Sequence, residues 1–419
     1  MKDVFNNKLI PGLIKFSNFK FVKAMQAAVT AGMGATILGS IFMVLNNPPF
    51  PADMTNGFIE AWRMWAAANG AWLNLGYQVT LEMVGLYTLI GMAVVVSEMN
   101  GVRPTNMIVT STAAFLILTT ELVDKNLAVG FLNARGMVTG MLVGYFVVEA
   151  SCYLLNHGLK IKLPDSVPPF VAEPISSLLV NIVVIGAVVL VRLAVGGATG
   201  GQLLPQVINN LFAPLFMVSD SFLAAVIYAV VLRFLWFFGL HGGNIAGAVM
   251  TPIVSVALAE NASAFAAGQP MPHIFTQMFV QTWVNMGVLP MVAAMMLVCR
   301  SQQNKAISKI ALVPALFNIG EPLTFGLPVV MNFKILVPWL LCFGLNSGAA
   351  YLATSAGFIG RTFVNVPYTV PCFLKVFLST MDYKAVILYV ILFAVNVILF
   401  IPWLKRYDQE LVEHEKSEA

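Results

Sequence analysis

Glu321 is a carboxylate that stands alone in a long apolar stretch. It is the only charged residue between Lys309 and Lys334, with Gly320 before it and Pro322 after it. A carboxylate in a low-dielectric pocket can orient a hydroxyl group or accept its proton. Because a buried charge is costly, Glu321 is expected to face a polar cavity and to be used there. The alternative is a carboxylate that only ties down a hairpin tip through hydrogen bonds.

His241 is the second isolated candidate. No other ionisable residue lies between Arg233 and Glu260, and Gly239 and Gly242 stand on either side of the histidine. Glycines let the backbone approach a ligand closely, and an imidazole can donate to one hydroxyl while it accepts from another. A lone histidine can also be a satisfied packing residue. The residues alone leave both interpretations open.

The elements that must position these residues are membrane helices. The chain is 59% hydrophobic and 10% charged, with a mean hydropathy of +0.84, which is far from the balance of soluble proteins. Four uncharged runs reach the ~20 residues that cross a hydrocarbon core. These are Ala24–Leu45, Ile274–Cys299, Ile335–Gly360 and Ala385–Leu404, and further candidates lie near 76–97, 105–120, 137–157, 176–191 and 218–240. We therefore predict an all-α polytopic membrane protein with about ten crossings.

Basic residues set the expected orientation. Lys2, Lys8, Lys15, Lys20 and Lys23 precede the first apolar run, and Lys405 and Arg406 follow the last one. The positive-inside rule then predicts that both termini lie in the cytoplasm and that the number of crossings is even. The first apolar run has full spanning length, so the N-terminus is not read as a cleavable signal peptide. The net charge of +4 fits membrane topology and does not indicate nucleic-acid binding.

The chain divides into two halves of different character. Residues 1–200 form the first half, which ends in the glycine-rich stretch 196–202, and residues 201–217 are predicted to be an amphipathic connector. In the second half, 218–405, glycine, proline and asparagine repeatedly interrupt the apolar stretches, before a tail at 406–419. Broken helices survive in lipid only where protein or a water-filled cavity satisfies their backbone. The substrate path is therefore expected in the second half.

Several functional classes are excluded by the absence of their motifs. The sequence contains no HExxH, Walker A or GxSxG pattern, and its four cysteines have no metal-ligand spacing. The cysteines are read as small buried hydrophobic residues, and no metal or cofactor is expected. Glu82, Glu149 and Arg192 of the first half are interpreted as structurally paired or interfacial, with a substrate role as the alternative. The small-residue run 31–40 is expected to pack closely within or between subunits.

Four motifs resemble the membrane permease, enzyme IIC, of the bacterial phosphoenolpyruvate-dependent phosphotransferase system. They are WFFGLHG (236–242), KLPDSVPPFV (162–171), ALVPALFNIGEPLTFGLPVVMN (311–332) and NVPYTVP (365–371). The resemblance covers nearly the whole chain and is strongest to the lactose, cellobiose and N,N′-diacetylchitobiose type. It implies about ten transmembrane helices plus two re-entrant hairpins, in a bacterial cytoplasmic membrane. It also implies a homodimer held by the first half and a sugar site in the second.

The resemblance places the family's motif histidine on His241 and its motif glutamate on Glu321, both at the sugar and near the hydroxyl that receives phosphate. Three positions depart from the family pattern: Gly320 stands in place of Asn, Phe333 in place of Pro and Tyr368 in place of Trp. The departures concern the sugar contacts and leave the reaction class intact. The predicted substrate-binding residues are Gly242, Asn244, Asn318, Gly320, Asn332 and Tyr368.

The resemblance implies group translocation, in which a soluble phosphorylated IIB protein, charged through IIA, phosphorylates the sugar. Sequence physics alone favours a different class, an ion-coupled carrier in which Glu321 binds a proton or sodium ion. An intramembrane hydrolase is disfavoured because no nucleophile, metal or paired aspartate is present. The sugar is left open among cellobiose, N,N′-diacetylchitobiose, lactose and a monosaccharide. Tyr368 could stack on a pyranose face, or it could be a packing tyrosine.

Overall fold

The computed structural model describes residues 15, 18–50, 56–164, 168, 174–238, 240, 242–327, 329 and 332–418. The chain forms two compact units, Met1–Phe216 and Met217–Ala419. The boundary between them falls at the end of the expected connector, which is the helix α11 (Leu204–Ser219).

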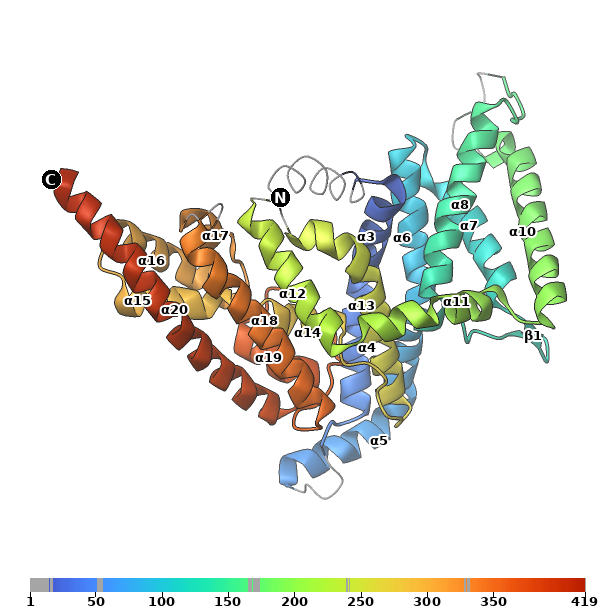
Figure 1. The fold of residues 1–419 in the computed structure, drawn as a ribbon. Coiled ribbons are helices and arrows are strands. Elements are labelled where there is room, and N and C mark those ends of the chain that lie inside the picture. Colours follow the sequence, from blue (N-terminus) through green and yellow to red (C-terminus); the bar gives the residue numbers. More distant parts are fainter. Residues whose placement is uncertain are drawn as a thin grey trace. The chain divides into compact units, whose positions relative to one another are not determined.

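The first unit is a group of packed helices. α6, α7 and α8 pack against one another, and α10 packs against α7 and α8 (Figure 1). Its elements before α11 are α3 (Lys20–Ala31), α4 (Met33–Asn46), α5 (Gly57–Gln78), η2 (Leu81–Met83), α6 (Val84–Met99), α7 (Pro104–Thr119), β1 (Leu122–Val123), β2 (Asn126–Leu127), η3 (Ala134–Gly136), α8 (Met137–Asn156) and α10 (Leu178–Thr199). β1 and β2 form an antiparallel hairpin.

The polar residues noted in the first half have structural partners. Glu149 forms an ion pair with Lys20 (2.6 Å). Arg192 donates to the carbonyl oxygens of Ile117 (2.7 Å) and Thr120 (2.9 Å). Asn133 donates to Glu82 (2.9 Å). Each of the three charged side chains thus has a polar partner within the chain, as the structural interpretation predicts.

Close packing also explains a glycine of the small-residue run 31–40. A Cβ on Gly39 would lie 2.6 Å from the side chain of Leu81 and 2.7 Å from that of Thr80. The absence of a side chain lets α4 approach the segment that precedes α6. Gly39 thus serves packing within the chain, which is one of the two roles expected for this run.

The second unit packs around buried aromatic side chains. Trp283, Trp339, Phe343 and Tyr389 are each at most 1% exposed and belong to one hydrophobic core. The elements of this unit are α12 (Phe222–Phe237), α13 (Gly242–Ala266), α14 (Gln277–Phe279), the π-helix η4 (Val280–Val284), α15 (Val288–Val298), α16 (Gln302–Leu316), α17 (Glu321–Gly326), α18 (Phe333–Ser355), α19 (Cys372–Thr380) and α20 (Tyr383–Glu418). α18 packs against α12 and α20, and α15 packs against α16 and α20.

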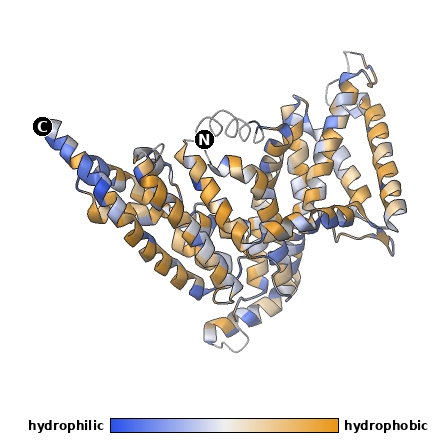
Figure 2. Cartoon of the chain, viewed as in Figure 1, coloured by the Kyte–Doolittle hydropathy of each residue, from blue (hydrophilic) through white to orange (hydrophobic). Residues whose placement is uncertain are grey.

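The lengths and composition of the helices fit a membrane protein. Within the described residues, eight helical stretches are long and apolar enough to cross a membrane, and α7 and α12 are shorter apolar helices. Hydrophobic residues run along the helices, whereas the last turns of α20 are hydrophilic (Figure 2). The multi-pass, all-α prediction is confirmed, while the expectation of about ten crossings stays a prediction.

Candidate functional site

Glu321 begins a short helix just after a sharp turn. α16 ends at Leu316, and Asn318 then adopts a left-handed backbone conformation with φ of 65°. Gly320 is the N-cap of the six-residue α17, and Pro322 lies in its first turn, where a missing N–H costs nothing. The residue Glu321 is exposed, and a carboxylate is favourable at the positive end of a helix. The helix breakers around Glu321 thus present it at a turn.

Asn318 joins this turn to a distant loop. Its Nδ2 donates to the carbonyl oxygens of Tyr368 (3.0 Å) and Val370 (2.9 Å). In return, the hydroxyl of Tyr368 donates to the backbone carbonyl of Asn318 (2.6 Å). Asparagine visits the left-handed conformation more readily than most residues, which suits it to this turn. Two of the predicted substrate-binding residues, Asn318 and Tyr368, are therefore in direct contact.

Two residues of α19 complete the contact. The thiol of Cys372 donates to Oδ1 of Asn318 (3.2 Å). The Nζ of Lys375 donates to the carbonyl oxygen of Tyr368 (3.3 Å) and lies 4.8 Å from the centroid of its ring. Lys375 is only 1% exposed. We call Asn318, Glu321, Tyr368, Cys372 and Lys375 the hairpin site.

Sequence reasoning missed both residues of α19. The cysteines were expected to be buried, and all four are, including Cys372; its hydrogen bond to Asn318 was not foreseen. Lys375 carried a clear signal, because it is the only charged residue between Arg361 and Asp382. This is the same kind of isolation that singled out Glu321.

Arg233, on α12, is a second buried cation of this unit. It is 6% exposed, and its Nη2 donates to Oδ1 of Asn285 (2.6 Å). Its guanidinium lies 3.8 Å from the ring centroid of Phe343, a cation–π contact. Glu321 and Tyr368 lie within its electrostatic range. In the described part of the chain Arg233 belongs to no ion pair.

Of the other predicted residues, Gly242 and Asn244 lie on α13. His241 lies outside the described residues. Gly242 begins α13, and a Cβ there would overlap the carbonyl oxygen of Leu232, so close packing on α12 already requires a glycine. Asn244 is an exposed residue in the first turn of α13. The structure does not describe how His241 stands relative to the hairpin site.

Gly320 and Asn332 have structural roles next to Glu321. A Cβ on Gly320 would come within 3.1 Å of the side chain of Val288. Asn332 is the N-cap of α18, where its Oδ1 accepts from the backbone N–H of Lys334 (3.1 Å). Helix capping satisfies a backbone donor that would otherwise lack a partner. Both residues were predicted to contact the sugar. The geometry shows that each also has a structural role, Gly320 in close packing and Asn332 in helix capping.

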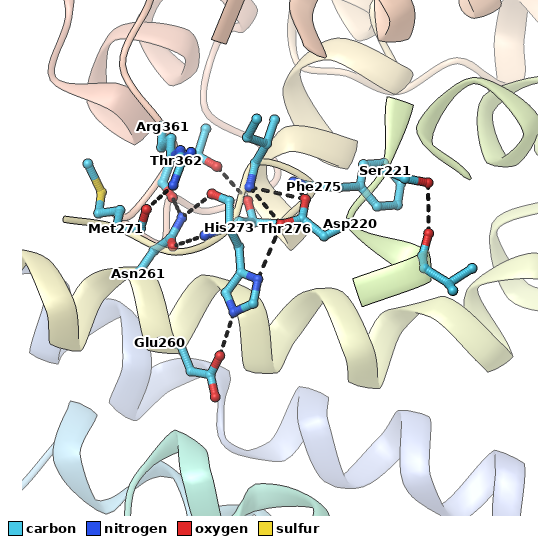
Figure 3. A network of polar contacts seen from close by, with 12 residues as sticks. Asp220, Ser221, Glu260, Asn261, Met271, His273, Phe275, Thr276, Arg361 and Thr362 are labelled. Carbon is cyan, nitrogen blue, oxygen red and sulfur yellow. Dashed lines mark hydrogen bonds and ion pairs between the residues drawn. The ribbon is translucent and has the colours of Figure 1, made fainter. Parts of the chain in front are cut away.

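A separate polar cluster lies in the same unit, centred on His273 (Figure 3). Nε2 of His273 contacts Oε2 of Glu260 (2.5 Å), and Nδ1 contacts Oδ2 of Asp220 (3.3 Å). Asp220 also accepts from the backbone N–H groups of Ile274 (3.1 Å) and Phe275 (2.7 Å). We call Asp220, Glu260 and His273 the His273 cluster.

The charges of the His273 cluster stabilise one another. Burial by itself would lower the pKa of His273, but the hydrogen bonds and charges of Asp220 and Glu260 outweigh it and raise the pKa to about 9. Burial would raise the pKa of Asp220, yet the hydrogen bonds from His273 and the backbone hold that pKa below its usual value. His273 is therefore an imidazolium between two carboxylates at neutral pH.

Asn261 ties the His273 cluster to a second loop. Its Nδ2 donates to the carbonyl oxygens of His273 (2.8 Å) and Thr362 (2.9 Å), and its Oδ1 accepts from the N–H of His273 (2.9 Å). Arg361 donates to the carbonyl oxygen of Met271 in the same region (Figure 3). These described partners all belong to the chain itself, so the His273 cluster holds its loops together.

The chemistry that the hairpin site offers is acid–base and electrostatic. Glu321 supplies an accessible carboxylate, Tyr368 an aromatic face, and Lys375 and Arg233 buried positive charge. Among the described residues no group of three or more His, Cys, Asp or Glu could hold a metal ion. The arrangement can bind a polyhydroxyl compound and accept a hydroxyl proton.

Comparison with known proteins identifies relatives of the whole chain. The family model described as "Phosphotransferase system, EIIC" matches residues 26–342. The "Lichenan permease IIC component" of Bacillus subtilis is 30% identical over 100% of this chain and 96% of its own length. The "PTS system oligo-beta-mannoside-specific EIIC component" of the same species is 29% identical over 98% of this chain and 95% of its own length.

A solved structure has the same fold. It is the crystal structure of "the transporter ChbC, the IIC component from the N,N'-diacetylchitobiose-specific phosphotransferase system", with a TM-score of 0.89 and 27% sequence identity. The match covers 99% of this chain and 100% of that chain. The similarity therefore extends through both units.

Proposed function

Because this chain belongs to the EIIC family of the phosphotransferase system and is a sugar-specific permease component, we propose that it carries a β-linked disaccharide that is phosphorylated as it is delivered. The observation that supports this best is the hairpin site, where an accessible carboxylate, Glu321, follows a turn that is hydrogen-bonded to an aromatic residue, Tyr368. A carboxylate and an aromatic face are the two features that a sugar hydroxyl and a pyranose ring need.

In this proposal Glu321 orients the reacting hydroxyl and accepts its proton. The phosphoryl donor has to approach in line with that hydroxyl, and holding both in position supplies much of the rate enhancement. His241 is proposed to hold the sugar through a hydroxyl hydrogen bond. Gly242, Asn244, Gly320 and Asn332 are proposed to line the site.

The proposed donor is a phosphorylated IIB protein that a IIA protein recharges. All four cysteines of this chain are buried, so none is accessible to carry a phosphoryl group. One relative, the "PTS system lactose-specific EIICB component" of Lacticaseibacillus casei, is 27% identical over 100% of this chain, and the match spans 73% of that protein. That relative is named as an EIICB component, which supports a IIB protein as the proposed phosphoryl donor.

The proposed sugar class comes from the relatives' names. They include oligo-beta-mannoside, lichenan, cellobiose, lactose and N,N′-diacetylchitobiose components. Most of these names denote a β-linked disaccharide, which is why we propose that class of sugar. We further propose a homodimer through the first unit, in a bacterial cytoplasmic membrane, with both termini in the cytoplasm.

The test is phosphorylation of a sugar panel in vesicles that contain the purified protein. The panel is cellobiose, lactose and N,N′-diacetylchitobiose, supplied with phosphoenolpyruvate, the general system proteins and IIA, with and without IIB. We expect a sugar phosphate inside the vesicles only when IIB is present. Sugar phosphate made without IIB would contradict the partner assignment. Free sugar that accumulates with an imposed ion gradient would contradict group translocation.

A further inference from the structure

Lys375 is a buried cation whose charge the proposed reaction does not yet use. It lies on α19, is 1% exposed, and is among the largest fully buried side chains of the chain. Within the described ranges it forms no ion pair with a carboxylate. Its two described contacts are the carbonyl oxygen and the ring of Tyr368. Burying a lysine costs free energy through side-chain entropy and desolvation, so a buried lysine without a carboxylate calls for a specific role.

The ammonium is held where it acts on Tyr368. The carbonyl oxygen of Tyr368 accepts from both Lys375 (3.3 Å) and Asn318 (3.0 Å), and the ring lies 4.8 Å from Nζ. Attraction between the cation and the ring quadrupole favours this arrangement. Lys375 therefore fixes the loop that carries Tyr368 and adds a positive charge behind its ring.

Nζ of Lys375 lies over one face of the Tyr368 ring, and Tyr368 is 41% exposed. A sugar that stacks on this ring would therefore lie against the opposite face. A group stacked there would lie roughly 4 Å from the ring plane, about 8–9 Å from Nζ. At an effective dielectric constant of about 20, a unit charge at that distance changes Kd on the order of tenfold.

Arg233 adds to the same field. It is buried and lies within electrostatic range of Tyr368 and Glu321. Of the charged side chains that the structure describes around Tyr368, two are buried cations, Lys375 and Arg233, and one is the carboxylate of Glu321. A positive field of this kind penalises a ligand ammonium and tolerates neutral hydroxyls.

We propose that Lys375 sets the charge preference of the sugar site: through its position behind Tyr368 it disfavours disaccharides that carry an ammonium group and leaves neutral disaccharides as the ligands. This inference rests on the proposed function, because it takes Tyr368 as a wall of the sugar site. Lys375 is a positioning residue in this scheme, since it acts through Tyr368.

The experiment compares matched neutral and amino sugars by calorimetry on the purified full chain. Cellobiose is paired with chitobiose, its diamino counterpart, and lactose with lactosamine, at mildly acidic pH where the amines are protonated. N,N′-diacetylchitobiose serves as a neutral control for the size of the substituent. The variants are Lys375→Met, Lys375→Gln and Lys375→Arg. Lys384→Met, which alters an exposed lysine, is the matched control.

We expect the wild type to bind the neutral sugar more tightly than its amino counterpart. Lys375→Met should reduce that ratio of Kd values about tenfold, whereas Lys375→Arg and Lys384→Met should keep it. A purely structural lysine would weaken both sugars equally and leave the ratio unchanged. If Lys375→Met aggregates in size-exclusion chromatography, the ratio of Kd values is compared between Lys375→Gln and the wild type.

The outcomes separate the two proposals. If a neutral disaccharide binds but the wild type does not discriminate, or the neutral variants discriminate as the wild type does, only the role of Lys375 is overturned. If no neutral disaccharide of the panel binds, the proposed sugar class and the role of Lys375 both fail.

Discussion

The hairpin site and the His273 cluster are polar groups of the same unit with opposite charge arrangements. In the His273 cluster the imidazole lies between the carboxylates of Asp220 and Glu260. In the hairpin site the described polar contacts of Lys375 are a carbonyl oxygen and a ring, and Glu321 is exposed. Charges that are paired internally hold loops together, whereas charges without such pairing remain available to act on a ligand. The difference supports the proposal that the hairpin site, and not the His273 cluster, binds substrate.

The largest expected effect tests whether the hairpin site takes part in the reaction. Glu321→Gln keeps shape and hydrogen bonding but cannot accept the hydroxyl proton, so phosphorylation should fall at least on the order of 100-fold. Sugar phosphorylation in membranes with saturating phosphorylated IIB measures this, and Glu98→Gln, which alters an exposed glutamate, is the control. Near-normal turnover by Glu321→Gln would remove it from the chemistry. An aggregated variant beside a monodisperse wild type would favour a structural role.

The next largest effect tests whether the His273 cluster stabilises the fold. Asp220→Asn leaves the imidazolium of His273 with one carboxylate fewer and weakens two backbone hydrogen bonds. We expect a loss of about 1–3 kcal/mol of stability, seen as a lower thermal midpoint in detergent. Sugar affinity at temperatures below the transition should stay as in the wild type. Asp124→Asn on an exposed turn is the control, and a variant with normal stability but lost sugar binding would reverse the assignment of the two clusters.

A smaller effect is expected at Tyr368, whose ring and hydroxyl have different roles. Tyr368→Ala removes the stacking face and should weaken sugar binding by about 1–2 kcal/mol. Tyr368→Phe keeps the face and loses only the hydrogen bond to the carbonyl oxygen of Asn318 (2.6 Å), so most of the affinity should remain. Both Kd values can be measured by calorimetry. Equal affinity of Tyr368→Ala and the wild type, in a correctly folded protein, would reject the contact.

A further effect is a pH dependence specific to the His273 cluster. The pKa of His273 is raised to about 9 in the fold, against about 6.5 in an unfolded chain. The stabilisation is therefore complete below about pH 6.5 and is lost as the pH rises through 9. The thermal midpoint of the wild type should fall across this range relative to His273→Gln. Parallel pH profiles of the two proteins would show that the histidine is not protonated in the fold.

The sequence by itself was sufficient for the fold class, and it singled out one residue of the candidate site. Apolar runs longer than a bilayer crossing depend only on composition along the chain, so α8 and α18 lie close to the predicted segments 137–157 and 335–360. Glu321 was found because an isolated charge between helix breakers is visible in the sequence. By the same reasoning Lys375 was predictable, because it is the only charged residue between Arg361 and Asp382.

Only the tertiary structure decided which polar residues meet. Asn318 and Tyr368 are 50 positions apart, and their mutual hydrogen bonds depend on how two loops are brought together. The N-cap of α18 also depends on the fold: the side chain of Asn332 caps this helix, while its predicted sugar contact stays a prediction. His273 had no motif at all, because its two carboxylate partners come from separate segments, at 220 and 260. Local pattern reveals a charge that needs a partner, whereas the path of the chain in three dimensions determines whether that partner is another residue or a ligand.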